Sequence, residues 1–263
     1  MPIAKVNGQA IAYEDSGGDG PAVIFSHGLM MDHTMFDPQV AALKDRYRCI
    51  AWDERGHGGT AKDTLSPFTY YDSADDLAAL LAHLGIKQAV LAGMSQGGFL
   101  SLRCALTHPE VVRALILIDT QAGTEDVSRL GGYIQLAQNW ADNGLDDPTA
   151  TFIENVILGR PGWDGAAAWK AKWRAMKGVN IIGCMNTLAR RDDIHWRLGE
   201  IKVPALVIHG DEDAAIDLEL AKAMTKGLAD AALVEIPGAG HSANLTHPGP
   251  VNPAIEAFLA QLG

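Results

Sequence analysis

Five unbroken apolar runs recur along the chain, and segments of helical periodicity lie between and after them. The runs are AVIFS (22–26), RCIAW (48–52), AVLAG (89–93), ALILID (114–119) and PALVIHG (204–210). Such runs are typical of parallel strands that are buried on both faces of a sheet. The clearest helical patterns lie at 73–85, 99–108 and 218–228. Strands that alternate with helices predict an α/β fold, in which helices cover both faces of a mostly parallel sheet.

Three shorter strands complete the expected sheet. Residues 3–7 and 9–14 form a predicted pair joined by an Asn7-Gly8 hairpin turn, and ALVEI (232–236) follows the last helical pattern. The expected number of strands is therefore eight. Ligands of such sheets bind beyond the carboxyl ends of the strands, so functional residues are expected there.

The alternation of strands and helices stops between about residues 121 and 200. This stretch is helical in composition and contains no convincing strand. We therefore predict a core domain of residues 1–120 and 201–263, with a helical cap of residues 121–200 inserted after the sixth strand, over the carboxyl ends of the strands. The cap holds five of the six tryptophans, namely Trp140, Trp163, Trp169, Trp173 and Trp196.

One cap segment, AAAWKAKWRAMKG, combines tryptophans with cations. Helical spacing places Trp169, Trp173 and Met176 on one face, and three cations lie on the adjoining face, namely Lys170, Arg174 and Lys177. Two interpretations are open: the aromatic side chains pack the cap onto the core while the cations face solvent, or these side chains line a site beneath the cap. As a group they indicate that such a site is apolar.

Composition and charge narrow the possible partners. The chain has 263 residues, of which 48% are hydrophobic and 20% charged, and no apolar stretch approaches the length of a membrane span. A formal net charge of −11 opposes binding to nucleic acid or to an anionic membrane surface, so neither is expected as a partner. The N-terminus lacks an export signal and the three cysteines are widely spaced, which together predict a cytoplasmic protein. The oligomeric state is left open.

A serine lies among glycines in the segment LAGMSQGG at 91–98. The segment follows a buried run and opens a helix, the context that a G-x-S-x-G nucleophile elbow requires. In so tight a turn the serine adopts a strained backbone conformation, and the positions two before and two after it must be nearly free of side chain. The strain exposes the hydroxyl of Ser95 at a helix N-terminus, where N–H groups favour negative charge. Ser95 is therefore a candidate nucleophile.

Several motifs in a fixed order carry a family resemblance. The elbow, the segment SHGL at 26–29 and the segment DERGHG at 53–58 together resemble the α/β-hydrolase superfamily, over nearly the whole chain apart from the cap. The segment RRDD at 190–193 and the pair Gly240-His241 look most like the group of small esterases and 3-oxoadipate enol-lactonases. The resemblance implies the α/β-hydrolase fold, with a mostly parallel eight-stranded sheet and a helical cap.

The resemblance also supplies partners for Ser95. In this family the order along the chain is nucleophile, acid, histidine. The family pattern of an acid three residues after the glycine of HGDED selects Asp213, and the motif PGAGH selects His241 as the base. Asp119 also ends a strand and is the main alternative for the acid. The implied catalytic triad is Ser95, Asp213 and His241.

Backbone N–H groups are expected to stabilise the negative charge that develops on the carbonyl oxygen of a substrate. The amide that follows the nucleophile, Gln96, is one expected donor, and the family pattern points to Leu29 as the other. The histidines of the two early motifs, His27 and His57, are expected to hydrogen-bond only within their turns. The expected substrate pocket, for whose methionines core filling is the alternative role, comprises Met30, Met94, Trp140, Trp169 and Trp173.

These residues predict a serine hydrolase that cleaves a carboxylic ester or lactone of a small, largely apolar substrate through an acyl-enzyme. A carbon–carbon bond hydrolase with the same triad, a cofactor-free oxygenase and a small-molecule receptor that retains the triad are the alternatives. Serine at position 95 argues against haloalkane dehalogenases and epoxide hydrolases, which would need aspartate there. A loose dinucleotide fingerprint at 56–61 leads into an expected loop rather than a helix, and no metal or cofactor is expected.

Overall fold

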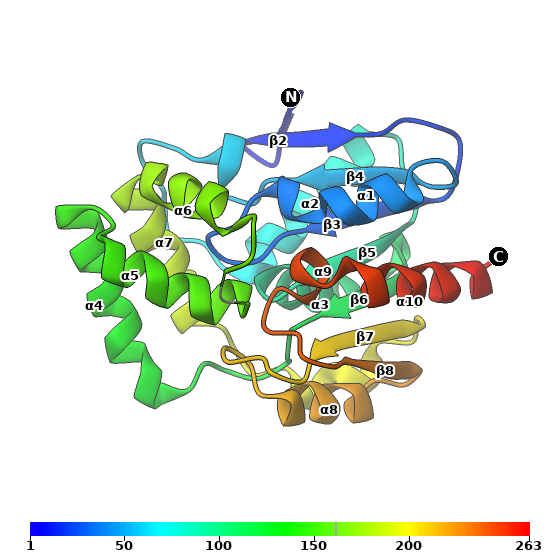
Figure 1. Ribbon diagram of the computed structural model, residues 1–263. Helices are drawn as coiled ribbons and strands as arrows, with labels where there is room; N and C mark the ends of the chain where they lie inside the picture. The colour runs from blue at the N-terminus through cyan, green and yellow to red at the C-terminus, as the bar shows by residue number, and fades with distance from the viewer. Residues whose placement is uncertain (161) are drawn as a thin grey trace.

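The eight strands expected from the sequence all form, and they join into one sheet (Figure 1). The strands are β1 (Ile3–Val6), β2 (Gln9–Asp15), β3 (Ala22–Ser26), β4 (Arg48–Trp52), β5 (Ala89–Met94), β6 (Val112–Ile118), β7 (Ala205–Gly210) and β8 (Ala231–Ile236). In the computed structural model, which describes residues 1–160 and 162–263, their order in the sheet is β1-β2-β4-β3-β5-β6-β7-β8. The pairs β1–β2 and β2–β4 are antiparallel, and every other pair is parallel.

The turn between β1 and β2 forms as the sequence predicts. Asn7 and Gly8 have φ angles of +45° and +70°, both in the left-handed region. Two left-handed residues build the type of two-residue turn that matches the twist of a hairpin. Because Val6 pairs directly with Gln9, the loop holds only these two residues.

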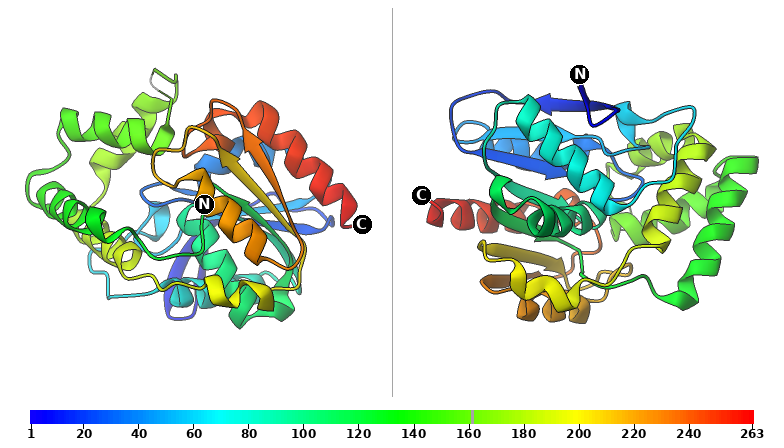
Figure 2. Two further views of the ribbon diagram at one scale, coloured as in Figure 1. Left: turned by 90° about the horizontal axis from the view of Figure 1, so that it is seen from below. Right: turned by 180° about the vertical axis from the view of Figure 1, so that it is seen from behind.

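Helices cover both faces of the sheet (Figure 2). The helices of the core are α1 (Asp37–Leu43), α2 (Tyr70–His83), α3 (Gln96–Thr107), α8 (Leu218–Gly227), α9 (Ala243–Thr246) and α10 (Pro248–Gln261). One hydrophobic cluster joins Phe25 and Ala92 to side chains of α1 and α10, whereas the other joins Ile24 and Leu91 to side chains of α2, α3 and α8. Consecutive strand residues thus enter opposite layers, which explains why the runs are apolar throughout.

The segment between β6 and β7 is helical where the structure describes it, and we call its helices α4 to α7 the cap. Figure 1 shows the cap helices together beyond the carboxyl ends of the parallel strands. They are α4 (Val127–Asn143), α5 (Asp147–Ile153) with the π-helical turn Glu154–Leu158, α6 (Ala166–Ala175) and α7 (Gly178–Ala189). Short 3₁₀ turns elsewhere span His33–Phe36, Gly58–Thr60, Pro109–Val111 and His195–Glu200. No helix within the described ranges is long and apolar enough to cross a membrane.

The cap helix α6 is shorter than its sequence pattern suggests. Trp169 and Trp173 lie on it and are both buried, but Met176 follows the helix with an extended backbone, at φ −66° and ψ +136°. The chain leaves the helix here because α7 begins only two residues later, at Gly178. A Cβ atom at Gly178 would lie 2.7 Å from Cα of Ala141, so glycine permits close packing of α7 on α4.

Candidate active site

The turn between β5 and α3 holds Ser95 in a strained conformation. Ser95 has φ +50° and ψ −113°, a left-handed conformation that side chains rarely adopt. A Cβ atom at Gly97 would lie 1.9 Å from the carbonyl oxygen of Ser26, and one at Gly93 would lie 2.2 Å from the carbonyl oxygen of Gly97. Both contacts are shorter than any real one, so the glycines allow the turn to close and to present the Ser95 hydroxyl.

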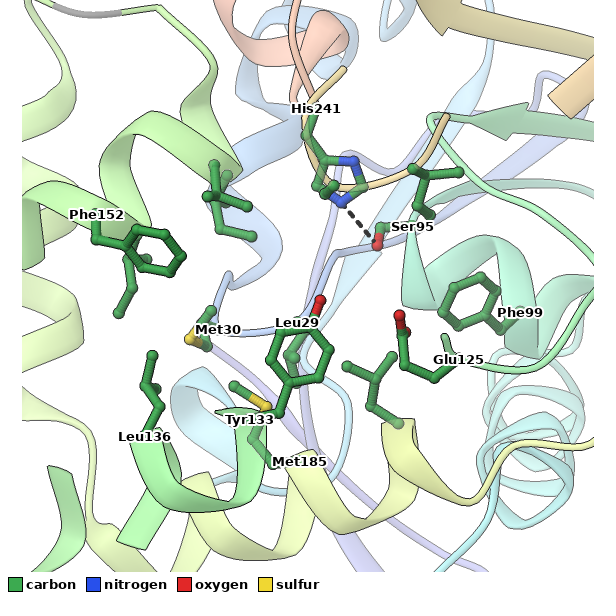
Figure 3. A pocket seen from close by; sticks show the side chains of 16 residues that line it. Leu29, Met30, Ser95, Phe99, Glu125, Tyr133, Leu136, Phe152, Met185 and His241 are labelled. Carbon is green, nitrogen blue, oxygen red and sulfur yellow. Dashed lines mark hydrogen bonds between the residues drawn. The ribbon is translucent and has the colours of Figure 1, made fainter. Parts of the chain in front are cut away.

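A hydrogen-bonded chain links Ser95 to two partners far away in sequence. Nε2 of His241 lies 3.0 Å from Oγ of Ser95 (Figure 3), and Nδ1 of His241 lies 2.8 Å from Oδ2 of Asp213. The other carboxylate oxygen of Asp213 accepts N–H groups from Ala215 and Ile216, at 2.8 and 3.0 Å. These two bonds fix the carboxylate so that its free oxygen faces the imidazole. The structure therefore brings together the three residues that the sequence selected.

Burial and neighbouring charges act in opposite directions on the pKa values of His241 and Asp213. Burial by itself lowers the pKa of His241, but the charge of Asp213 and the hydrogen bond to it outweigh burial and raise that pKa above its usual value. Burial would raise the pKa of Asp213, yet the neighbouring His241 and the hydrogen bonds hold it below its usual value. Asp213 is accordingly ionised at neutral pH, and it stabilises an imidazolium that forms on His241.

Asp119, the alternative acid, occupies a different position. It is fully buried at the end of β6, with φ +47°, and its two carboxyl oxygens accept N–H groups from Gly210 and Ala243, each at 2.9 Å. Burial and the nearby charge of Asp213 raise its pKa. Asp119 thus ties the end of β7 to the segment that follows His241, and Asp213 is the acid that hydrogen-bonds to the imidazole.

One group of side chains near the triad has the spacing of metal ligands. Ligand atoms of Asp119, His209 and Asp213 all lie within 4.8 Å of one another. The carboxyl oxygens already accept backbone N–H groups or bond to His241, and Nε2 of His209 bonds to the carbonyl oxygen of Ile216 at 2.9 Å. N–H groups that point at a carboxylate also point their positive charge at any cation there. These residues therefore do not fit a metal ion.

Two backbone N–H groups beside Ser95 are free to bind an anion. Neither the N–H of Gln96, which opens α3, nor that of Leu29 has a hydrogen-bond partner among the described residues. The next N–H in the loop, that of Met30, is used, because it donates to Nε2 of His57 at 3.1 Å. Leu29 and Gln96 are the two donors expected from the sequence, and their amides have the chemistry of an oxyanion hole.

Each histidine of the two early motifs hydrogen-bonds within its own turn, as expected, but each ring also accepts an N–H from the loop of the other motif, which the expectation of local bonds did not include. Nδ1 of His27 lies 2.8 Å from the carbonyl oxygen of Gly28, and its Nε2 accepts the N–H of Glu54 at 3.0 Å. Nδ1 of His57 lies 3.0 Å from the carbonyl oxygen of Arg55. Burial lowers the pKa of His57 to about 3, so the ring stays neutral and can accept the N–H of the loop. Both rings fix the loops around the nucleophile.

A cavity of about 80 Å³ opens beside Ser95 and His241 (Figure 3). All but four of its 16 lining residues are apolar, and the polar ones are Ser95, His241, Glu125 and Tyr133. The apolar lining comprises Leu29, Met30, Phe99, Leu136, Phe152, Ile153, Val156, Ile157, Met185, Leu188, Ala215 and Ile216. The cap therefore supplies most of the wall opposite the nucleophile.

The prediction of the pocket residues is mostly wrong. Of the five, Met30 lines the cavity, whereas four lie outside its lining, namely Met94, Trp140, Trp169 and Trp173. All four are buried in the hydrophobic core cluster, to which Met30 also belongs. The simpler interpretation, that the aromatic side chains pack the cap onto the core, is therefore the correct one.

The contacts of the cap tryptophans and cations explain this outcome. Nε1 of Trp173 donates to the carbonyl oxygen of Met30 at 3.0 Å, so the ring stabilises the loop that contains Leu29 and Met30. Lys170 does not enter the cavity but pairs with Glu154 at 2.6 Å. Arg174 also lies outside the cavity lining, and its guanidinium pairs with Asp147 at 2.5 Å. The large side chains fill the interior of the cap, because burying them there removes the most apolar surface from water.

The residues that do line the cavity carry a weaker sequence signal. Tyr133 and Leu136 on α4 are three residues apart, as are Met185 and Leu188 on α7. This spacing places each pair on one helix face, but amphipathic core helices show the same pattern. Glu125 lies in the loop before α4, where no periodicity marks it.

The chain is similar to known proteins in sequence and in fold. The model of the family described as alpha/beta hydrolase fold matches residues 21–248. The protein named 3-oxoadipate enol-lactonase 2 of Acinetobacter baylyi is 28% identical over 253 residues, which cover 95% of this chain and 93% of that protein. Among solved structures, a thermophilic esterase from Thermogutta terrifontis is similar with a TM-score of 0.89 at 27% identity, over 100% of this chain and 97% of the other. The enol-lactonase from Burkholderia xenovorans has a TM-score of 0.90 at 25% identity, over 98% and 100%. The family model covers most of the chain, and the protein therefore belongs to the alpha/beta hydrolase fold family.

Proposed function

We propose that this hydrolase cleaves a carboxylic ester or lactone of a small, largely apolar substrate through an acyl-enzyme on Ser95. The observation that carries the proposal is the chain of hydrogen bonds from Ser95 through His241 to Asp213, at 3.0 and 2.8 Å, beside an apolar cavity. A serine hydroxyl becomes a nucleophile when a neighbouring base removes its proton, and an acid must hold that base in the correct tautomer. The relatives named as an esterase and as enol-lactonases support ester and lactone substrates.

The first half of the reaction forms the acyl-enzyme. Oγ of Ser95 attacks the carbonyl carbon while Nε2 of His241 takes the hydroxyl proton, and the carbonyl electrons move onto the oxygen. The N–H groups of Leu29 and Gln96 donate to that oxygen, and such donors are each worth about 3 to 4 kcal/mol. When the carbonyl reforms, the bond to the alcohol oxygen breaks and His241 returns its proton to the leaving alcohol. Asp213 remains ionised throughout.

The second half consumes one water molecule. His241 removes a proton from the water, whose oxygen attacks the acyl carbon of Ser95, and the same two amides stabilise the second oxyanion. Collapse of this intermediate breaks the bond between the acyl carbon and Oγ, and His241 gives its proton to Ser95. The net reaction is ester plus water to acid plus alcohol. A lactone follows the same steps and releases one hydroxy acid.

The size of the cavity suggests short acyl groups. At about 80 Å³ it is smaller than the roughly 150 Å³ cavity that accepts a benzene molecule in an apolar protein core. We expect kcat/KM on p-nitrophenyl esters to fall at least about tenfold between butyrate and octanoate, because surplus methylenes cannot be buried in it. Leu136→Ala removes part of the wall and is expected to restore activity on the longer ester.

Leu130→Ala is the matched control for this chain-length prediction. Leu130 lies on the same helix and is also half-buried, but it does not line the cavity. It should leave the ratio of butyrate to octanoate rates unchanged. A native enzyme that prefers octanoate, or an equal effect of both leucine variants, would contradict the assignment of the cavity as the acyl site.

Covalent labelling tests the proposed nucleophile directly. A fluorophosphonate is expected to bind one mole per mole of protein, with the label on the peptide that contains Ser95, because the activated hydroxyl displaces fluoride. Mass spectrometry of the digested protein locates the label. The variant Ser95→Ala should take up none, and Ser128→Ala, which changes an exposed serine of α4, should be labelled as the native protein is. Labelling elsewhere, or none at all in the folded native protein, would overturn the proposal.

A further inference from the structure

The side chain of Glu54 lies behind the nucleophile elbow and has no part in the chemistry proposed above. It is 2% exposed, Oγ of Ser73 lies 2.5 Å from its Oε1, and Nε2 of Gln96 donates to its Oε2. No lysine, arginine or histidine side chain of the described residues forms an ion pair with it. The nearest cation in sequence, Arg55, is engaged by both carboxylate oxygens of Asp76.

A buried acid without a cationic partner favours its neutral form, because an unpaired charge in the interior is costly. The hydrogen bonds around Glu54 suit that form. Oγ of Ser73 lies 2.5 Å from Oε1 of Glu54 and 3.4 Å from the carbonyl oxygen of Thr69, so Ser73 can donate to an ionised Glu54, or accept from a protonated one while its own O–H donates to Thr69. The second carboxyl oxygen accepts the amide of Gln96. When Glu54 carries one proton, its carboxyl group and the side chains of Ser73 and Gln96 that bond to it all have hydrogen-bond partners.

The titratable groups near Glu54 come from α2, from α7 and from the loop that follows β4. Burial raises the pKa of Glu54 to about 8, and Asp76 on α2 acts in the same direction, whereas Arg55 and the hydrogen bonds from Ser73 and Gln96 oppose it. Tyr70 on α2 and Cys184 on α7 are also close, and burial raises the pKa of both well above the usual values, so they stay neutral. Loss of the Glu54 proton therefore falls in the pH range of an enzyme assay.

The side chain of Gln96 connects Glu54 to the reacting atoms. Its Nε2 donates to Glu54, and its Oε1 lies 3.4 Å from the hydroxyl of Tyr70. Contacts at both ends of the amide fix one orientation of the residue. Its backbone N–H is one of the two free donors beside Ser95, so the bond to Glu54 holds an oxyanion donor in place.

We propose that Glu54 is a positioning residue whose neutral carboxyl group holds Gln96 with its N–H toward the oxyanion, and that loss of this proton slows catalysis. The inference rests on the proposed function. An ionised Glu54 places a buried negative charge one glutamine residue and two hydrogen bonds away from the oxyanion, at about 8 Å. Two unit charges at that distance, at an effective dielectric constant of about 20, oppose the transition state by roughly 30-fold in rate.

The effect should appear in kcat rather than in KM, because the oxyanion charge exists only in the transition state. We expect kcat of the native protein on a p-nitrophenyl ester to fall about 10- to 30-fold as the pH rises through about 8. In Glu54→Gln the amide reproduces the neutral carboxyl group, with one donor for Ser73 and one acceptor for Gln96. This variant should keep kcat within about threefold at pH 7 and lose the alkaline fall. Glu54→Leu, which has similar size but no hydrogen bonds, should lower kcat at every pH.

The control Glu110→Gln changes net charge by the same amount on an exposed side chain, and it should behave as the native protein. An alkaline fall that persists unchanged in Glu54→Gln would overturn the inference. If that variant does not fold, infrared spectra of the native protein decide: a protonated-carboxyl C=O band that loses intensity between about pH 7 and 9 supports the inference, and a band that stays constant overturns it.

The same experiment separates this inference from the proposed function. The rate of fluorophosphonate labelling is measured beside ester hydrolysis, since both reactions place negative charge between the two amides. Labelling of Ser95 with an alkaline fall that Glu54→Gln removes, together with no ester turnover, supports the inference and contradicts the proposed substrate. No reaction of either kind at Ser95 contradicts the proposed function, and the inference with it.

Discussion

Replacing Ser95 by alanine is expected to lower the rate of ester hydrolysis by about four to six orders of magnitude, to the limit of detection. The substitution removes only the attacking oxygen, while the amides of Leu29 and Gln96 and the cavity stay in place. The reaction then has to proceed by direct attack of water, without the acyl-enzyme. Initial rates on p-nitrophenyl acetate and butyrate, with the native protein and the variant side by side, measure the effect.

The control for this prediction is the fold of the variant. Alanine at position 95 keeps the left-handed backbone that the tight turn imposes, and circular dichroism and thermal unfolding should match those of the native protein closely. Equal ester hydrolysis by native protein and variant would mean that another residue attacks. A native protein that is folded but silent on both esters would favour the carbon–carbon hydrolase or the receptor among the alternatives.

Replacing Asp213 by asparagine is expected to lower kcat about 10⁴-fold, as the equivalent change does in serine proteases. The asparagine amide cannot hold the imidazole of His241 in the tautomer that accepts the Ser95 proton. The pKa of His241 should also fall, because the charge of Asp213 is what raises it. The histidine must be neutral to act as a base, so the acid limb of the pH profile moves to lower pH in the variant.

Asp119→Asn is the matched control, since Asp119 is the other buried acid of this region. Asparagine retains one of the two acceptors for the N–H groups of Gly210 and Ala243, so the main loss is in stability. We expect kcat of this variant to fall at most about tenfold, with a lower melting temperature. A folded Asp119→Asn protein that loses as much activity as Asp213→Asn would show that the wrong acid has been assigned.

The strands and the nucleophile elbow could be predicted because their signals are local. A strand buried on both faces has to be apolar along its whole length, as in AVIFS at 22–26, and a serine turn this tight needs glycine at Gly93 and Gly97. His241 was found by its place in a family order, which holds because the parallel strands end at the same edge of the sheet. None of these predictions required knowledge of which helix packs on which.

Only the tertiary structure decided which side chains meet. Sequence pattern could not separate Trp173, which braces a loop, from Met185, which lines the cavity, because both lie on apolar helix faces. For the acid, the family pattern favoured Asp213 over Asp119, and the structure adds the physical reason: Asp213 bonds to His241, whereas both carboxyl oxygens of Asp119 accept N–H groups from distant segments. The sequence by itself determined the strands, the elbow and the order of the triad; the cavity and the burial of Glu54 depend on packing between elements, which no local pattern encodes.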